Sequence, residues 1–174
     1  MAIATGLYII VNAWQNKQAY LRTTQNNLAA NSQQNDAYEQ WNVQDLGNGI
    51  YTIKNAGTNT FATAGRDQEN AIVEGQSSSH QWTIKETPIK GLFSIATTST
   101  GLFWGLVDGS SGTPIALAST VSDGRNCWVF KLTSPRAVPR PAAAPAPAHV
   151  PAPGFYNPGG GPQFGPDVPI PTWR

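Results

Sequence analysis

Hydrophobic and polar residues alternate in short runs over the first 134 residues of the chain. Three of these runs open with glycine, an apolar residue and an aromatic residue: Gly6-Leu7-Tyr8, Gly49-Ile50-Tyr51 and Gly91-Leu92-Phe93. Each continues with apolar residues at every second position, a period typical of half-buried β-strands. No stretch shows the pattern of a long, capped helix. The chain is therefore predicted to be an all-β protein.

Each opening run is followed by a closing run that contains a tryptophan: Gln40-Trp41-Asn42-Val43, Gln81-Trp82-Thr83-Ile84 and Cys127-Trp128-Val129-Phe130. The opening glycines are 43 and 42 residues apart, and the tryptophans are 41 and 46 residues apart. Opening and closing runs thus recur together, in the same order, three times. This recurrence indicates an internal repeat of about 42 residues.

Two further short apolar runs lie between the opening and closing runs of every repeat. In the first repeat they are Ala19-Tyr20-Leu21 and Leu28-Ala29-Ala30, with turn-forming Asn26-Asn27 between them. Four strands in each of three repeats predict twelve strands. Propeller blades also have four strands, but a propeller typically needs four or more blades. We therefore expect a β-trefoil over residues 1–134, with repeats at about 6–48, 49–90 and 91–134.

The composition changes sharply at Pro135. Twelve of the fourteen prolines lie at or beyond this position, and proline is excluded from central strands. Residues 135–174 are therefore expected to form a Pro/Gly-rich C-terminal tail, with polyproline II structure in its first part. Its aromatic residues are expected to dock on the trefoil or on a partner; they are Phe155, Tyr156, Phe164 and Trp173.

The remaining tryptophans divide into two groups. Trp41, Trp82 and Trp128 recur once in each repeat, so we expect them to fill the shared core. Trp14 and Trp104 break the repeat, and symmetric packing does not account for them. These two are candidates for contact with a ligand or a partner.

The repeat opening Gly-x-Tyr-x-Ile-x-Asn is closely kept at residues 6–12 and 49–55, and an Asp-Gly-Ser-Ser-Gly-Thr-Pro-Ile run spans residues 108–115. On these features residues 3–134 resemble the ricin-B-like lectins, most closely the lectins of mushroom fruiting bodies. The resemblance covers about three quarters of the chain. It implies a β-trefoil fold, a fungal source and a non-catalytic, carbohydrate-binding function. The implied partner is a glycan or glycoprotein.

In this family an aspartate usually binds the sugar, and it follows the apolar residue of the second strand of a repeat. The corresponding positions are Arg22 after Leu21, Thr63 after Ala62 and Gly105 after Trp104. None of the three residues is a carboxylate that accepts two hydrogen bonds from sugar hydroxyls. The usual galactose-type pocket is therefore expected to be altered in all three repeats.

The third repeat is the preferred sugar site on this resemblance. Trp104 would stack on a sugar face, while Asp108 and Asn126 would supply polar contacts. The alternative role for Asp108 is that of a turn residue, because Asp-Gly-Ser-Ser-Gly is favourable turn chemistry. In the first repeat, Asn31 and Glu39 fall near the other sugar-contacting positions of the family.

The sequence offers little for catalysis or for metal binding. Its two histidines, His80 and His149, and its single cysteine show no metal-ligand spacing, so no metal or cofactor is expected. No serine is marked as a nucleophile beside a histidine. Cys127 adjoins a repeat-closing tryptophan and is expected to be a buried, inert thiol. We therefore expect no enzymatic activity.

Charge and apolar content limit the remaining partners. The formal net charge is +1, which offers no field for nucleic acid. The N-terminus does not read as a signal peptide, and no apolar stretch is long enough to insert in a membrane. A cytoplasmic protein is expected, with non-standard export left open. A homodimer is also left open.

Two alternative functions compete with glycan binding. β-Trefoil loops also serve fungal protease inhibitors, in which one surface loop enters the cleft of the protease. The first loops to test would be Gly109–Pro114 and Ala13–Ala19. A structural or interaction protein that functions through its tail is the third possibility. A glycan array and a panel of proteases would distinguish glycan binding from protease inhibition.

Overall fold

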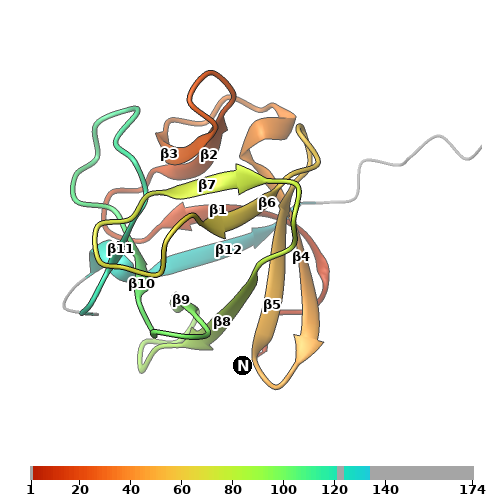
Figure 1. The fold of residues 1–174 in the computed structure, drawn as a ribbon, viewed down its shortest axis with the longest axis vertical. Coiled ribbons are helices and arrows are strands. Elements are labelled where there is room, and N and C mark those ends of the chain that lie inside the picture. The colour runs from red at the N-terminus through yellow and green to blue at the C-terminus, as the bar shows by residue number, and fades with distance from the viewer. Residues whose placement is uncertain (1, 121–123, 134–174) are drawn as a thin grey trace, which may run out of the picture. The chain divides into compact units, whose positions relative to one another are not determined.

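The computed structural model describes residues 2–120 and 124–133. These residues form twelve β-strands and two short 3-10 helices (Figure 1). The first repeat contains β1 (Gly6–Asn12), β2 (Gln18–Arg22), β3 (Asn27–Asn31), η1 (Ala37–Glu39) and β4 (Gln40–Gly47). The second contains β5 (Ile50–Asn55), β6 (Phe61–Ala64), β7 (Val73–Gln76) and β8 (Gln81–Glu86). The third contains β9 (Phe93–Thr97), β10 (Phe103–Gly105), β11 (Ala116–Ala118), η2 (Gly124–Asn126) and β12 (Trp128–Leu132).

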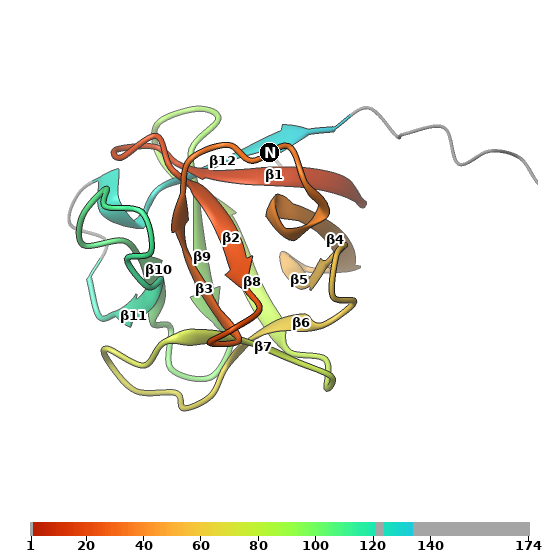
Figure 2. The same ribbon diagram turned by 90° about the horizontal axis from the view of Figure 1, so that it is seen from above.

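Six strands close into an antiparallel barrel. Around it, β1 pairs with β4, β4 with β5, β5 with β8, β8 with β9, β9 with β12, and β12 again with β1. The other six strands form the hairpins β2–β3, β6–β7 and β10–β11. These hairpins contact one another, and in Figure 2 β7 passes the ends of β2 and β3. The predicted β-trefoil of three repeats is confirmed.

The repeat-closing tryptophans fill the barrel core, as predicted. All three are fully buried. Each indole Nε1 donates a hydrogen bond to a carbonyl of the hairpin in its own repeat. The bonds join Trp41 to Ala19 (2.8 Å), Trp82 to Ala62 (2.8 Å) and Trp128 to Trp104 (3.1 Å).

These hydrogen bonds correct the alignment of the first repeat. The residue equivalent to Ala62 and Trp104 is Ala19, whereas the sequence comparison used Leu21. A two-residue shift leaves every side chain on the same face of a strand, so the apolar pattern alone cannot detect it. The position of the lectin aspartate is therefore occupied by Tyr20, in place of Arg22. The corrected position is still not a carboxylate.

A buried polar residue ends the first strand of every repeat. These residues are Asn12, Asn55 and Thr97, none more than 2% exposed. In each, a side-chain oxygen accepts hydrogen bonds from the backbone of the loop that follows. Polar groups with so little access to water are costly unless hydrogen-bonded. These hydrogen bonds fix three equivalent loops, one in each repeat, at residues 13–17, 56–60 and 98–102.

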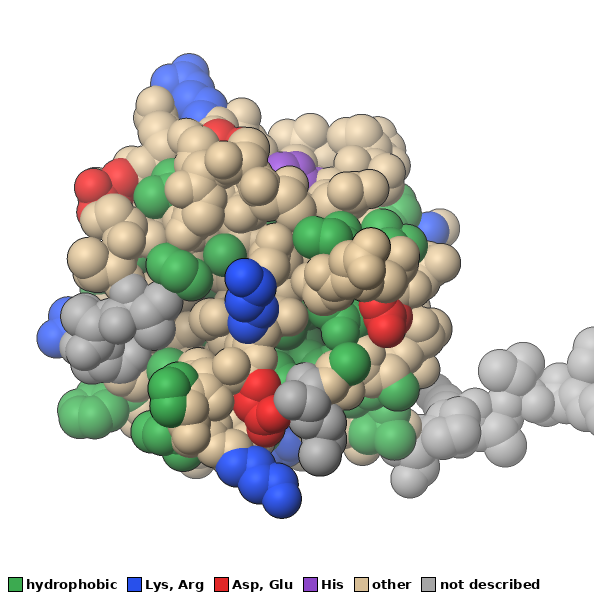
Figure 3. Space-filling model, turned by 90° about the horizontal axis from the view of Figure 1, so that it is seen from below, with side chains coloured by type: hydrophobic (Ala, Val, Ile, Leu, Met, Phe, Trp, Pro, Cys, Tyr) green, Lys and Arg blue, Asp and Glu red, His purple; other side chains and the backbone are tan. Residues whose placement is uncertain are grey.

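Figure 3 shows one face on which small groups of hydrophobic side chains are scattered among polar groups and charges of both signs. Within the described part of the chain, no helix is long and apolar enough to span a bilayer. The predictions for the tail, including its docking aromatics, and for His149 fall outside the described residues.

Candidate functional site

Trp104 belongs to the core and not to a sugar platform. Its side chain is fully buried. The ring packs edge-on against Trp82 at 5.2 Å and against Trp128 at 5.9 Å between centroids. Its Nε1 has no hydrogen-bond partner among the described residues. No face of this indole is available to stack on a sugar.

Two of the predicted polar contacts are also structural. Glu39 is fully buried, and its carboxylate accepts hydrogen bonds from the backbone N–H groups of Gln34 and Asn35, both at 2.8 Å. Glu39 thereby fixes the loop before η1. Asn126 is buried as well, and its Nδ2 donates to the Trp104 carbonyl at 3.3 Å. Both side chains are committed to the fold.

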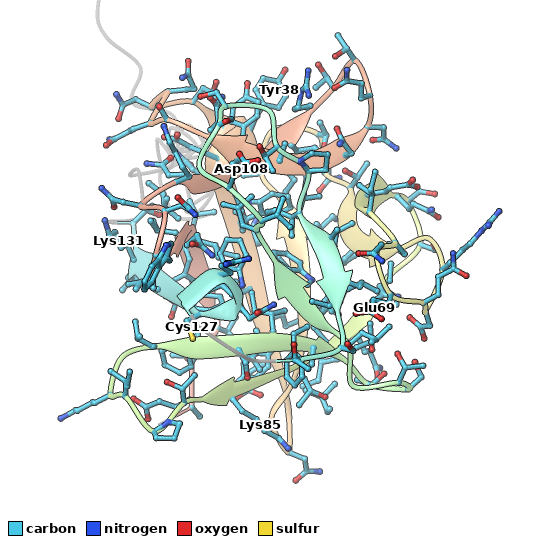
Figure 4. All side chains as sticks on the ribbon, turned by 90° about the vertical axis from the view of Figure 1, so that its left-hand side faces the viewer. Tyr38, Glu69, Lys85, Asp108, Cys127 and Lys131 are labelled. Carbon is cyan, nitrogen blue, oxygen red and sulfur yellow. The ribbon has the colours of Figure 1, made fainter. Side chains whose placement is uncertain are left out.

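Asp108 is exposed but its carboxylate faces its own loop (Figure 4). Its Oδ1 accepts hydrogen bonds from the Ser110 N–H at 2.7 Å and from the Thr113 hydroxyl at 2.6 Å. The Thr113 hydroxyl, and then the Ser110 N–H, hold the pKa of Asp108 below its ordinary value. This geometry matches the turn role that the sequence offered as the alternative for Asp108.

Asn31 lies apart from the third-repeat candidates. It lines a shallow hollow of about 250 Å³ together with Tyr20, Arg22 and Gly112. Arg22 Nη1 donates to the Gly112 carbonyl at 3.3 Å, so the loop before β11 lies beside this hollow. The five predicted site residues therefore do not form one site.

The two loops that were named for protease contact lie side by side. The first, Ala13–Ala19, covers the β1–β2 loop (residues 13–17) and the start of β2, and the second, Gly109–Pro114, is part of the β10–β11 loop (residues 106–115). A Cβ placed on Gly109 would lie 2.7 Å from Gln15 Oε1, so the two loops are in close contact there. Far apart in sequence, these loops are brought together only by closure of the barrel.

A third segment joins the bases of these loops. The carbonyl oxygen of Arg125, in η2, accepts hydrogen bonds from Asn12 Nδ2 at 2.8 Å and from the Leu106 N–H at 3.1 Å. Asn12 immediately precedes one loop, and Leu106 immediately precedes the exposed part of the other. One carbonyl therefore sets the separation of the two loops.

Both loops are also fixed internally. Asn12 Oδ1 accepts hydrogen bonds from the N–H groups of Trp14 at 3.2 Å and Gln15 at 3.0 Å. The Gly112 N–H donates to the Ala30 carbonyl at 2.7 Å, which attaches the second loop to β3. Loops held in this way lose little conformational entropy when they bind a partner.

Large apolar side chains project from this region. Trp14 is 68% exposed and Val107 is 67% exposed. Tryptophan is among the residues that carry most binding energy in protein interfaces. We call residues Ala13–Lys17 and Val107–Gly112 of these two loops the two-loop surface. Trp14 breaks the sequence repeat, so symmetric core packing does not account for it, and its exposure agrees with that interpretation.

No group of three or more His, Cys, Asp or Glu side chains in the described part of the chain is arranged to hold a metal ion. His80 packs against Trp82 at 4.6 Å between ring centroids. Burial lowers the pKa of His80, against an opposing effect of Asp67. Cys127 is buried, as predicted.

Sequence reasoning missed the β6–β7 loop (residues 65–72). Residues 65–70 are all exposed and include Arg66. In the sequence this loop is a plain polar stretch with one basic residue, which carries no motif. Several of its hydrogen-bond partners, Ser99, Leu117 and Ser119, lie in the third repeat, so only the structure reveals how it is held.

Comparison with known proteins gives two different results. A family model described as peptidase inhibitor I66 matches residues 1–131. No curated protein matches the chain. Solved structures with the same fold are much more numerous, and they include fungal lectins and a designed protein.

Three solved structures illustrate the likeness in fold. A Macrolepiota procera ricin B-like lectin in complex with lactose is 17% identical, with a TM-score of 0.71, covering 76% of this chain and 99% of the lectin. The Rhizoctonia solani agglutinin is 17% identical, with a TM-score of 0.68 and the same coverage. The designed threefold protein ThreeFoil is 18% identical, with a TM-score of 0.69, covering 74% and 99%. At such identities the likeness shows the shared fold.

Proposed function

Because the chain belongs to the peptidase inhibitor I66 family, we propose that it is a non-catalytic inhibitor that blocks a peptidase cleft with the two-loop surface. The main support is the meeting of two separately fixed loops, each of which exposes a large apolar side chain. Those side chains are Trp14 and Val107. Protease–inhibitor complexes generally form between surfaces that change little on binding.

The chemistry of the two-loop surface suits a peptidase cleft. Trp14 would supply the buried anchor, because an indole buries a large area and loses few rotamers on binding. The surrounding Gln15 and Ser110 side chains are polar and would form the rim. Binding by insertion needs no reaction at the surface, so no nucleophile or metal is required.

Inhibition assays against serine and cysteine peptidases test this proposal. We expect the full chain to inhibit at least one of them. Trp14→Ala should then raise the inhibition constant by about 30-fold or more, the loss expected for an interface hot spot. Ile89→Ala is the matched control, because Ile89 is another exposed apolar side chain, 65% exposed, on a different loop. Loss of inhibition in Ile89→Ala but not in Trp14→Ala would contradict the proposed site.

Glycan binding is the second candidate, and it was the function that the sequence resemblance favoured. Its support is the shared fold with lectins, together with the hollow beside Asn31 and Tyr20. The lack of a carboxylate at Tyr20, Thr63 and Gly105 weighs against the usual galactose-type contact. A glycan array with the intact chain tests it. Binding that is lost in Asn31→Ala would favour this candidate, and an array without signal at high protein concentration would exclude it.

A further inference from the structure

A hollow of about 450 Å³ lies beside the β6–β7 loop, in the second repeat. Five polar side chains line it: Arg66, Gln68, Asn70, Glu74 and Gln76. None of these side chains makes a hydrogen bond or an ion pair with another described residue. A small number of polar groups that converge on one hollow is typical of sites for small molecules.

The loop that forms one wall of this hollow is attached to the third repeat. Glu69 Oε1 accepts a hydrogen bond from the Ser119 hydroxyl at 2.7 Å. Leu117 accepts a hydrogen bond from the Asn70 N–H and donates one to the Ala71 carbonyl, both at 2.8 Å. A wall that is fixed in this way loses little conformational entropy when a ligand binds.

The β7 wall of the hollow presents hydrogen-bond acceptors. Glu74 is paired with Asn27 of β3 in antiparallel register, so the two side chains lie side by side on one face of the sheet. Asn27 is only 8% exposed, and its Oδ1 has no hydrogen-bond partner among the described residues. A Cβ placed on Gly65 would lie 3.3 Å from Glu74 Oε2, so the glycine leaves this carboxylate uncovered. Two neighbouring acceptors without a donor favour a cationic group that carries several N–H bonds.

The loop wall of the hollow presents a donor of the opposite charge. Arg66 is exposed, and its guanidinium group has five N–H donors and no acceptor. Such a group pairs with a carboxylate through two parallel hydrogen bonds. Arg66 and Glu74 line the same hollow without forming an ion pair with each other. Both charges are therefore available to a ligand.

Apolar surface completes the lining. Ala71 and Ile72 both line the hollow, and Ile72 is 40% exposed. A simple cation in the hollow would leave Arg66 unpaired, and a simple anion would lie close to the Glu74 carboxylate. A ligand with both an ammonium and a carboxylate group satisfies both side chains, and an apolar side chain on the same ligand would cover Ile72.

We infer that this hollow binds a small zwitterion with an apolar side chain, either a free α-amino acid or a dipeptide. Its ammonium group donates to Glu74 and Asn27, and its carboxylate accepts from Arg66. Because exposed ion pairs are weak in water, we expect a dissociation constant of about 1 mM. Figure 4 shows Glu69, in this loop, well separated from Asp108, in the β10–β11 loop. The inference is therefore independent of the two-loop surface and of peptidase inhibition.

A nuclear magnetic resonance titration of the full chain with four probes at neutral pH tests the inference. Leucine and leucyl-leucine carry both charges, N-acetyl-leucine carries only the carboxylate, and leucinamide carries only the ammonium group. We expect a saturable shift with leucine or leucyl-leucine, and the tighter of the two gives the length of the ligand. The singly charged probes should bind at least about 10-fold more weakly. Equal binding of either singly charged probe overturns the inference, as does the absence of a saturable shift with both zwitterions up to about 10 mM.

Charge-removing variants locate the site. Glu74→Gln and Arg66→Gln keep the size of the side chain or reduce it, and each should raise the dissociation constant of the zwitterion by about 10-fold. Glu69→Gln is the matched control, because Glu69 lies in the same loop but is bonded to Ser119 and is not among the residues that line the hollow. This variant should change the dissociation constant by less than about twofold. An equal loss of binding in Glu69→Gln and Glu74→Gln would overturn the assignment, since binding would then follow the overall charge of the loop. Thermal unfolding of each variant without ligand verifies that the fold is intact.

Discussion

The indole of Trp14 lies directly on Gly124. A Cβ placed on Gly124 would come within 2.9 Å of both Cβ and Cε3 of Trp14, a distance that side chains do not tolerate. The contact joins the β1–β2 loop to η2, and it leaves the indole 68% exposed. The absence of a side chain at Gly124 therefore sets the position of the exposed ring.

Gly124→Ala is predicted to displace the Trp14 indole and so to weaken inhibition through the two-loop surface. Rotation of the Trp14 ring cannot relieve the clash, because the added methyl group would also lie 2.9 Å from the Cβ of Trp14. We expect the inhibition constant to rise by about 10-fold or more, which corresponds to about 1.4 kcal/mol. Gly101→Ala is a suitable control, since it is also a loop glycine but has no atom within 4 Å of an added Cβ. Because Gly101 has φ 69°, this control should lose some stability and no inhibition.

Asn12→Ala is predicted to lower both stability and inhibition. Asn12 is fully buried, and its loss removes the bonds to the Trp14 and Gln15 N–H groups and to the Arg125 carbonyl. Leaving such groups unpaired costs about 1–3 kcal/mol. Urea unfolding and the inhibition assay measure the two effects.

Asn55→Ala is the matched control, because Asn55 has the equivalent place in the second repeat. It is also fully buried, and its Oδ1 accepts hydrogen bonds from the Gly57 and Thr58 N–H groups. A similar loss of stability with unchanged inhibition is expected. Equal effects of the two variants on inhibition would mean that the β1–β2 loop has no special role.

Trp104→Phe is predicted to be less destabilising than Trp128→Phe. Both indoles are fully buried, but Trp128 Nε1 donates a hydrogen bond and Trp104 Nε1 has no partner among the described residues. Only Trp128→Phe loses a hydrogen bond, worth about 1 kcal/mol, and leaves a carbonyl with one partner fewer. Trp104→Ala should cost about 3–5 kcal/mol through the cavity it creates. Denaturant unfolding measures all three, and a larger loss in Trp104→Phe than in Trp128→Phe would refute this account.

His80 is predicted to make stability depend on pH. Burial holds its folded-state pKa below the ordinary value of 6.5, so the unfolded chain binds a proton more readily. The stabilisation present above pH 6.5 is therefore lost as the pH falls from 6.5 through the lower folded pKa. His80→Gln should show a smaller loss of stability between pH 7 and pH 5 than the unchanged protein, measured by urea unfolding. An unchanged pH dependence in this variant would show that other groups control it.

The repeat, the trefoil fold and the core tryptophans could all be predicted from the order of residues along the chain. Gly6, Trp41 and their counterparts recur at nearly constant spacing because each repeat must supply the same strands and the same core ring to a symmetric barrel. Trp14 was also recognised as a residue that packing symmetry does not explain. These features depend on local alternation and on spacing, both of which are written directly in the order of the residues.

Other features depend on contacts between distant segments, and the repeat pattern does not predict them. Trp104 breaks the symmetry inside the core, and no local pattern distinguishes a buried ring from an exposed one at that position. The two-residue error that placed Arg22 where Tyr20 belongs arose because strand periodicity is unchanged by such a shift. The contacts of Gly109 with Gln15 and of Gly124 with Trp14 join segments about a hundred residues apart in the sequence. They exist only because the barrel closes and brings the first and third repeats together.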